Sequence, residues 1–327
     1  MVLCEVCHQA NAQVIRPETG QKVCKHCFSI CFEDEVLQTI RRFDLISPGD
    51  VVAIGVSGGK DSTVLMHVLH TLNQRYNLGF RIELVCIDEG IQGYRDNALE
   101  TVKKNAESYG LPLTILSFTE MFGWSLDQIF RATKTKETCT YCGIFRRRAL
   151  DIGAQKVGAT KVAVGHNADD VAETVLLNVL RGDLNRYARS VDIKTDGIES
   201  KVKNACIPPR IKPFAFQNQK EIVYYAHFNN LLYYAVECTY AVQAFRRFPR
   251  EYLVGKQQKD PLVMRRIIEG AIMYQQSIPQ DEKEKVEIGF CKKCGSACNH
   301  DVCMACHLLE KLANGYAQKQ IIEDKNE

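Results

Sequence analysis

The stretch Val51-Val52-Ala53-Ile54-Gly55-Val56-Ser57-Gly58-Gly59-Lys60-Asp61-Ser62 decides the fold of this chain. Its first half is a short apolar run rich in β-branched residues, which predicts a buried strand. Its second half leads into residues 64–72, where Val and Leu recur at the spacing of one helix face. Gly58 and Gly59 let backbone N–H groups approach phosphate oxygens, while the helix N-terminus and Lys60 supply positive charge. The stretch therefore predicts a phosphate-binding loop between a strand and a helix.

The loop departs from the Walker A motif, which has four residues between its first glycine and Gly-Lys, followed by Ser or Thr. Here Gly55 lies one residue too close, and Asp61 follows Lys60. A glycine-rich turn with a serine N-cap is the simpler alternative. Because a strand precedes it and a helix follows it, the segment from Ser57 to Ser62 instead resembles the PP-loop of the ATP-pyrophosphatase superfamily. That resemblance implies cleavage of ATP between its α- and β-phosphates, with transfer of AMP and release of pyrophosphate.

Strand and helix patterns continue to alternate after this loop. Residues 82–87 and 113–118 predict two further strands, and residues 95–109 predict an amphipathic helix that ends at Gly110. Such alternation predicts an α/β fold, in which helices cover both faces of a parallel sheet. Ligands bind at the carboxyl ends of the strands in such sheets, where the loops that follow them lie.

Residues 161–165 predict a fourth strand. The apolar face of the helix after it is formed by Val171, Val175, Leu176 and Val179. Residues 185–215 are polar and interrupted by prolines, which predicts an irregular segment. The chain from there to Gln276 predicts helices.

Composition indicates a globular chain without a membrane span. The 327 residues are 46% hydrophobic, which is enough for a large core. The longest apolar runs are far shorter than the roughly 20 residues that cross a bilayer. The N-terminus carries Cys4 and Cys7 instead of a signal segment. We therefore expect a soluble, cytoplasmic protein.

Most of the 15 cysteines occur in Cys-x-x-Cys pairs, which in a long chain of a reducing compartment favours metal over disulfides. Two such pairs lie near each end of the chain: Cys4 with Cys7, Cys24 with Cys27, Cys291 with Cys294, and Cys303 with Cys306. Four thiolates suit one tetrahedral Zn²⁺, so each end predicts a structural zinc knuckle. The alternative is terminal segments that stay disordered without metal.

These patterns divide the chain into three predicted parts. Residues 1–32 form an N-terminal zinc knuckle, and residues 33–278 form the catalytic domain with a helical C-terminal part. Residues 279–327 form a linker, charged over 281–285, and the C-terminal knuckle.

Three more cysteines, Cys139, Cys142 and Cys238, lie outside the knuckles. The cationic residues near them in sequence are Lys134, Lys136, Arg146, Arg147 and Arg148. Cationic neighbours favour the thiolate, which is the form that binds iron or attacks sulfur. Three thiolates can hold three irons of a [4Fe-4S] cluster and leave the fourth open to a ligand such as hydrosulfide. Persulfide and disulfide chemistry is one alternative, and an inert buried pair is another. The remaining cysteines, interpreted as packing or unpaired, are Cys31, Cys86, Cys206 and Cys298.

The net charge of +3 is too small to indicate a nucleic-acid partner by itself, but basic residues cluster locally. They are Arg181, Arg186, Arg189, Arg210, Lys212, Arg246, Arg247, Arg250, Arg265 and Arg266, and the aromatic residues among them are Tyr187, Phe214, Phe245 and Phe248. Together they suit RNA phosphates and a stacked base, whereas any single cluster alone suits a solvated helix face.

The combination of these motifs resembles the cytoplasmic tRNA 2-thiolation protein 1 family, with the archaeal and bacterial TtuA-type thiolases as relatives. The motifs are the terminal Cys-x-x-Cys pairs, the PP-loop, the segments 88–96 and 165–170, and the three middle cysteines. The resemblance implies ATP-dependent adenylation of the C2 carbonyl of the wobble uridine in tRNA, followed by its replacement with sulfur. It further implies a sulfur donor, the thiocarboxylated ubiquitin-related modifier, and a partner subunit, cytoplasmic tRNA 2-thiolation protein 2. A homodimer is the alternative assembly.

The resemblance also implies roles for individual residues. The expected ATP contacts are Val56, Ser57, Gly58, Gly59, Lys60, Asp61, Ser62, Ile87 and Gly165, with Asp61 orienting Mg²⁺ or the reacting group. The expected catalytic residues are Cys139, Cys142, Cys238, Asp170 and Arg146. Arg146 stands where relatives often carry a lysine that faces ATP. Because arginine stays protonated, charge stabilisation fits this position better than proton transfer.

Two other functions remain open at this level. One is a related nucleotidylating activity, such as cytidine thiolation or an amidating ligase. The other is a non-catalytic zinc scaffold that binds tRNA for another subunit, although a scaffold has no need for Lys60 and Asp61 together.

Overall fold

The computed structural model describes residues 2–133, 138–198, 207–236, 238–240, 245–279 and 288–323, with side chains described as far as residue 315. Lys134, Lys136, Cys206 and the predicted linker residues 281–285 lie outside this part of the chain.

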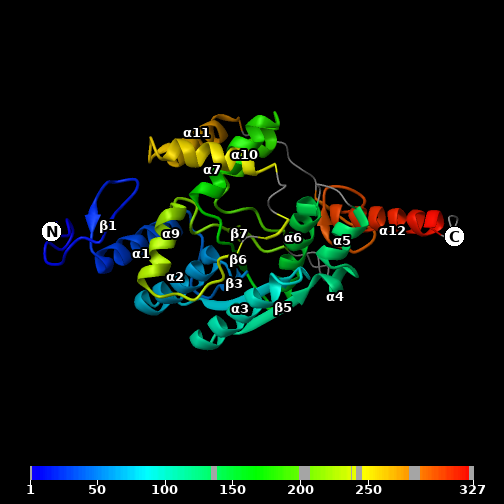
Figure 1. The fold of residues 1–327 in the computed structure, drawn as a ribbon, viewed down its shortest axis with the longest axis horizontal. Helices are drawn as coiled ribbons and strands as arrows, with labels where there is room; N and C mark the ends of the chain where they lie inside the picture. The colour runs from blue at the N-terminus through cyan, green and yellow to red at the C-terminus, as the bar shows by residue number, and fades with distance from the viewer. Residues whose placement is uncertain are drawn as a thin grey trace.

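A five-stranded parallel sheet forms the centre of the described structure (Figure 1). Its strands are β3 (Val51–Gly55), β4 (Arg81–Asp88), β5 (Leu113–Ser117), β6 (Lys161–Ala163) and β7 (Arg210–Ile211), in the spatial order β5-β4-β3-β6-β7. The direction of winding reverses between β3 and β6, and such a switch point opens a crevice at the carboxyl ends of the two strands. The PP-loop follows β3 at this position. The predicted α/β fold is confirmed.

Successive side chains of β3 point to opposite faces of the sheet, and both faces are covered by a hydrophobic core. Val52 and Ile54 belong to one hydrophobic core and Ala53 to the other. The first core lies under α1 (Lys25–Arg42), α2 (Lys60–Tyr76), α3 (Arg95–Tyr109) and α9 (Gln219–Phe228). The second lies under α4 (Phe118–Phe122), α5 (Leu126–Thr133), α6 (Thr138–Lys156) and α12 (Met304–Glu323).

A third core holds together the helices that follow β6. It is formed by α7 (Ala168–Leu180), α8 (Leu184–Ser190), α10 (Arg247–Gln257) and α11 (Val263–Ser277). Figure 1 shows α7, α10 and α11 gathered at the top of the molecule. Val179, expected on the apolar face of α7, is 55% exposed, because this core covers only the side of the helix that carries Val171 and Val175.

The segment predicted to be irregular, 185–215, contains regular structure. Helix α8 occupies its beginning, and β7 adds an edge strand to the sheet beside β6. Two strand residues between prolines are too short for a periodic pattern. Pairing with β6 on one side and a bridge to Lys194 on the other create this strand. Residues 229–236, predicted as helical, form no helix.

Each end of the chain forms a small hairpin followed by a helix. Strands β1 (Val14–Ile15) and β2 (Lys22–Val23) precede α1, and β8 (Gly289–Phe290) and β9 (Ala297–Cys298) precede α12. The two termini lie at opposite ends of the molecule in Figure 1. Helix α1 runs through the predicted boundary at residue 32 into the first core, and α12 packs on α5 and α6. The division into three parts stays a prediction.

Candidate active site

The loop after β3 has a conformation that depends on Gly58. Its φ is +84°, and a Cβ at this position would lie 2.6 Å from the carbonyl oxygen of Ala98 in α3. The Gly58 oxygen accepts a hydrogen bond of 2.8 Å from the backbone N–H of Tyr234. Ser62 Oγ closes the loop, since it accepts from Ser57 N at 3.1 Å and donates to Gly59 O at 3.1 Å. The loop is therefore held from α3, from α2 and from the segment after α9.

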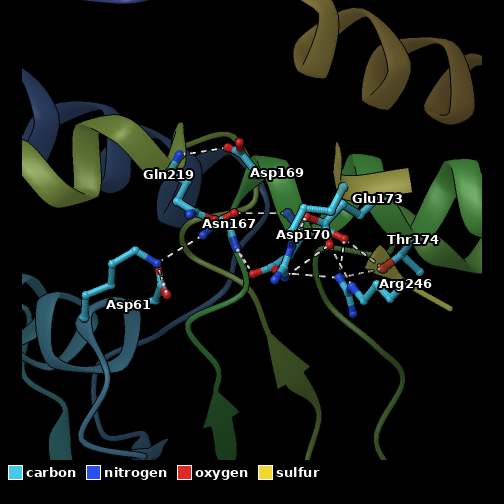
Figure 2. Close-up of polar contacts among 10 residues, drawn as sticks. Asp61, Asn167, Asp169, Asp170, Glu173, Thr174, Gln219 and Arg246 are labelled. Carbon is cyan, nitrogen blue, oxygen red and sulfur yellow. Dashed lines mark hydrogen bonds and ion pairs between the residues drawn. The ribbon is translucent and has the colours of Figure 1, made fainter. Parts of the chain in front are cut away.

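The β6–α7 connection packs directly on this loop. A Cβ on Gly165 would lie 3.0 Å from the backbone carbon of Asp61, so glycine permits this close approach. Asn167 donates to Asp61 Oδ1 at 3.0 Å (Figure 2). Lys60 Nζ lies 2.8 Å from Asp61 Oδ2. Because β3 and β6 are neighbours, the loops at their carboxyl ends meet, and Asp61 links them. Phosphate oxygens would compete with Asp61 for Lys60.

Asp170 has two sets of partners. It forms a capping box with Asn167 at the start of α7, through bonds of 3.0 and 3.3 Å. Arg246, just before α10, donates to the Asp170 carbonyl at 2.9 Å and lies 3.4 Å from its carboxylate (Figure 2). Burial raises the pKa of Asp170, and the charge of Arg246 opposes this shift. Arg246 also binds Glu173 at 2.8 Å, and Arg250 of α10 binds the same carboxylate at 2.8 Å, so two arginines connect this helix to α7 beside the site.

Helix α6 brings Cys139 and Cys142 to the same edge of the sheet. This helix leads back into β6, so it runs opposite to the strands and its first turn lies beside their carboxyl ends. Cys142 is buried, and Arg146 Nη2 donates to its Sγ at 3.3 Å. Cys139 is exposed, and its Sγ lies 3.5 Å from the carbonyl oxygen of Tyr240.

The three middle cysteines interact electrostatically. Burial raises the pKa of Cys142 to about 11, which Arg146 opposes and the charges of Cys238 and Cys139 reinforce. The pKa of Cys139 is raised first by burial and next by the charge of Cys238. The sulfurs of a [4Fe-4S] cluster bind different irons and need not converge on one point. Cysteine thiols are the donors that such a cluster takes from a protein, and the exposed Cys139 leaves one side of this group accessible.

The two terminal sets of cysteines have the geometry of zinc sites. In each set the four sulfurs lie within 4.8 Å of one another. The separations of Cys7 from Cys24 and of Cys294 from Cys303 are 4.0 and 3.6 Å. Tetrahedral zinc at a Zn–S distance of 2.3 Å places its sulfurs about 3.8 Å apart, so the donor sets fit zinc.

Backbone N–H groups favour the thiolate form of one cysteine in each knuckle, Cys4 and Cys291. Burial raises the pKa of Cys4, but the N–H groups of Cys7 and Cys24 outweigh it and lower that pKa to about 6. Cys291 has the corresponding arrangement, and its pKa is also lowered to about 6.

The predicted basic surface is more neutralised than the sequence indicated. Arg210 pairs with Asp151, Arg265 with Glu18, and both Arg246 and Arg250 with Glu173. Phe214, expected among the base-stacking aromatics, is wrong for that role because it is fully buried against Phe32. Phe245 and Phe248 are more than half exposed.

Sequence reasoning gave no role to Glu89 and Arg95, although both lie in a motif that it singled out. Arg95 donates to the carbonyls of Ser57 and Ile87 and is buried. Val56, another expected ATP contact, is buried, and its N–H bonds Val85 O at 2.9 Å. The sequence signal that could have indicated a role for Glu89 and Arg95 is their place together in the segment 88–96, which contains Gly90 and Gly93 and directly follows a buried strand.

Comparison with known proteins identifies the family. Residues 31–256 match the PP-loop domain. The cytoplasmic tRNA 2-thiolation protein 1 of Chlamydomonas reinhardtii is 47% identical over 96% of this chain and 85% of its own length. The protein of the same name from Saccharomyces cerevisiae is 45% identical over 98% of this chain and 89% of its own length. This chain belongs to the cytoplasmic tRNA 2-thiolation protein 1 family.

A solved relative extends the comparison to the fold. The U34-tRNA thiolase NcsA from Methanococcus maripaludis, determined with its [4Fe-4S] cluster, superimposes with a TM-score of 0.79 at 27% identity. The match covers 95% of this chain and 97% of NcsA. The family expected from the motifs is thus confirmed, and the PP-loop domain implies ATP binding. None of the described helices combines the length and apolar character needed to cross a bilayer.

Proposed function

We propose that this chain is a cytoplasmic tRNA thiolase that uses ATP to replace the C2 oxygen of the wobble uridine with sulfur. One observation carries the proposal: the PP-loop and the first turn of α6, which carries Cys139 and Cys142, lie at the carboxyl ends of the same sheet, and Cys238 interacts electrostatically with both thiols. An adenylating site alone selects no acceptor, and a thiol group alone activates no carbonyl. Membership of a family named for tRNA 2-thiolation supports the combination.

The loop side of the site activates the uridine. Its C2 oxygen attacks the α-phosphate of ATP, the bond to the β-phosphate breaks, and pyrophosphate leaves. Gly58, Gly59 and Ser62 bind the phosphates through the loop, and Lys60 neutralises the leaving charge. Asp61 holds Mg²⁺, and Val56, Ile87 and Gly165 line the nucleotide.

The cysteine side of the site supplies the sulfur. Cys139, Cys142 and Cys238 would hold a [4Fe-4S] cluster, whose chemistry is to bind and deliver inorganic sulfur. Arg146 stabilises negative charge beside Cys142, which its contact of 3.3 Å with that sulfur supports. Displacement of AMP from the activated carbon by sulfur completes the exchange. Asp170 orients the reacting groups from the start of α7.

The remaining partners follow from the same proposal. The sulfur donor is the thiocarboxylated ubiquitin-related modifier, and cytoplasmic tRNA 2-thiolation protein 2 is the second subunit. Two Zn²⁺ ions stabilise the terminal knuckles, and exposed aromatic residues such as Phe245 and Phe248 contact tRNA.

The test is a reconstituted thiolation assay with matched cysteine variants. Anaerobically prepared protein, its partner, tRNA, ATP and a sulfur donor are combined, and tRNA nucleosides are measured by mass spectrometry. Cys142→Ser is expected to abolish thiouridine while ATP still binds. Cys31→Ser, on α1 and outside the two terminal sets and the middle group, is expected to retain activity. Unchanged thiouridine in Cys142→Ser would contradict the proposal. If the wild-type reaction yields thiocytidine and not thiouridine, the cytidine alternative is favoured.

A further inference from the structure

A buried carboxylate lies between the nucleotide loop and the middle cysteines. Glu89 follows β4, and only 3% of its surface is exposed. One carboxylate oxygen lies 3.2 Å from Arg95 Nε, and the other lies 2.8 Å from Arg146 Nε. Glu89 thus binds two arginines from two different helices, α3 and α6.

Arg95 contacts the nucleotide loop, and Arg146 contacts the cysteine group. Arg95, also 3% exposed, donates to Ser57 O at 2.9 Å and to the carbonyl of Ile87. Arg146 donates to Cys142 Sγ at 3.3 Å. An unbroken path of polar contacts therefore runs from the loop through Arg95, Glu89 and Arg146 to a thiol.

Fold stability is a weak explanation for this arrangement. Burying a carboxylate and a guanidinium costs several kcal/mol per ion, and well-packed apolar residues often serve stability equally well. The three groups also carry one excess positive charge, at a position between the middle cysteines on one side and a phosphate-binding loop on the other. Without the Glu89 charge, two guanidinium groups would remain side by side and would repel each other.

We propose that Glu89 is a positioning residue that couples the nucleotide loop to the cysteine group through Arg95 and Arg146. This inference rests on the proposed function. Nucleotide bound at the loop displaces Ser57 and Ile87, whose carbonyls accept hydrogen bonds from Arg95, and the ion pairs of Glu89 carry that displacement to Arg146 and Cys142. Coupling between two binding sites is reciprocal, so a ligand that binds the cysteine group more tightly when nucleotide is present would raise the affinity for nucleotide by the same factor.

The coupling is measured without any thiolation step. The zinc-loaded protein without a cluster is treated anaerobically with iodoacetamide, with and without saturating α,β-methylene ATP. Peptide mass spectrometry gives the alkylation rates of Cys139 and Cys142. We expect the analogue to change the Cys142 rate about fivefold or more in the wild type, which is the lower end of typical coupling.

Two glutamates on one segment give a matched comparison. Glu89→Gln keeps the shape of the side chain and removes its charge, so we expect nearly equal rates with and without the analogue. Glu83→Gln changes a residue of β4 that pairs with Arg81 at 3.3 Å, away from the loop and the cysteines. It is expected to keep the full wild-type response. Glu89→Asp, which retains the charge but is shorter, is expected to restore part of it.

Several outcomes would overturn the inference. The first is that the analogue leaves the Cys142 alkylation rate of the wild type unchanged, and the second is that Glu89→Gln keeps the full response to the analogue. The third is that Glu83→Gln loses the response as much as Glu89→Gln does, which would indicate general destabilisation. Zinc content and thermal unfolding establish that each variant is folded. A wild-type protein that fails to thiolate tRNA would instead refute the proposed function, and the alkylation rates would still decide whether this path exists.

Discussion

Replacing Gly58 with Ala is expected to destabilise the PP-loop, whereas the same change at its neighbour Gly59 is not. An L-residue at a φ of +84° costs about 1–2 kcal/mol. The added Cβ would lie 2.6 Å from Ala98 O, and relieving such an overlap against backbone costs about 1–3 kcal/mol more. The free energy of unfolding should fall by about 2–5 kcal/mol.

Gly59 provides the control because it needs no special backbone. Its φ of −79° and ψ of 166° suit any residue, and its nearest neighbour is the rotatable Ser57 Oγ at 3.4 Å. Its substitution should change stability by less than about 1 kcal/mol, since alanine also restricts the unfolded chain.

The assay is thermal unfolding without nucleotide, because both variants disturb the phosphate contacts and nucleotide affinity would not separate them. At about 2–4 °C per kcal/mol, Gly58→Ala should melt at least about 2 °C below Gly59→Ala. Equal melting temperatures would refute the argument that backbone conformation and the contact with α3 require glycine at position 58.

Three further predictions concern metal, pH and charge. Cys4→Ser should lower the zinc content from about two ions per chain to about one, whereas Cys31→Ser should not, as elemental analysis can determine. Burial raises the pKa of Asp169 from 3.8 to about 6, so its folded-state penalty is absent below pH 4 and grows as pH rises through 6. The side-chain oxygen of Asn can still accept the hydrogen bond from the backbone N–H of Gln219 in α9. The free energy of unfolding of Asp169→Asn should therefore equal that of the wild type near pH 4 and exceed it by about 1–3 kcal/mol at pH 8. A larger stabilisation at pH 4 than at pH 8 would contradict this prediction. Arg246→Gln removes contacts with Asp170 and Glu173 and should lower the thiolation rate about tenfold or more. Arg266 is exposed and pairs with Asp260, so Arg266→Gln should keep the wild-type rate. Equal thiolation rates in the two variants would show that Arg246 only stabilises α10.

Much of the fold was predictable because its signals are local. The run 51–56 and the periodic residues after it predict a strand, a loop and a helix, and β3 and α2 occupy these positions. Gly110 was expected to end α3, and it does so in the left-handed conformation. The paired cysteines predicted two compact terminal sites, and in each the four sulfurs converge.

The active site was predictable only in its parts. Asp61 and Asn167 lie 106 positions apart and meet because β3 and β6 are neighbours in the sheet. Arg246 was expected to contact RNA, but it binds Asp170 and Glu173. β7 forms because β6 and the segment around Lys194 pair with it, and the burial of Phe214 depends on α1.

The sequence by itself determined which segments form strands, helices, a phosphate loop and metal knuckles, because backbone preference and side-chain periodicity act over a few residues. The tertiary structure decided which charges meet. Glu89 shows the difference, since its neighbours in sequence explain its contact with Arg95 but not its contact with Arg146 on α6. Strand order and helix packing set that contact, and no local pattern encodes them.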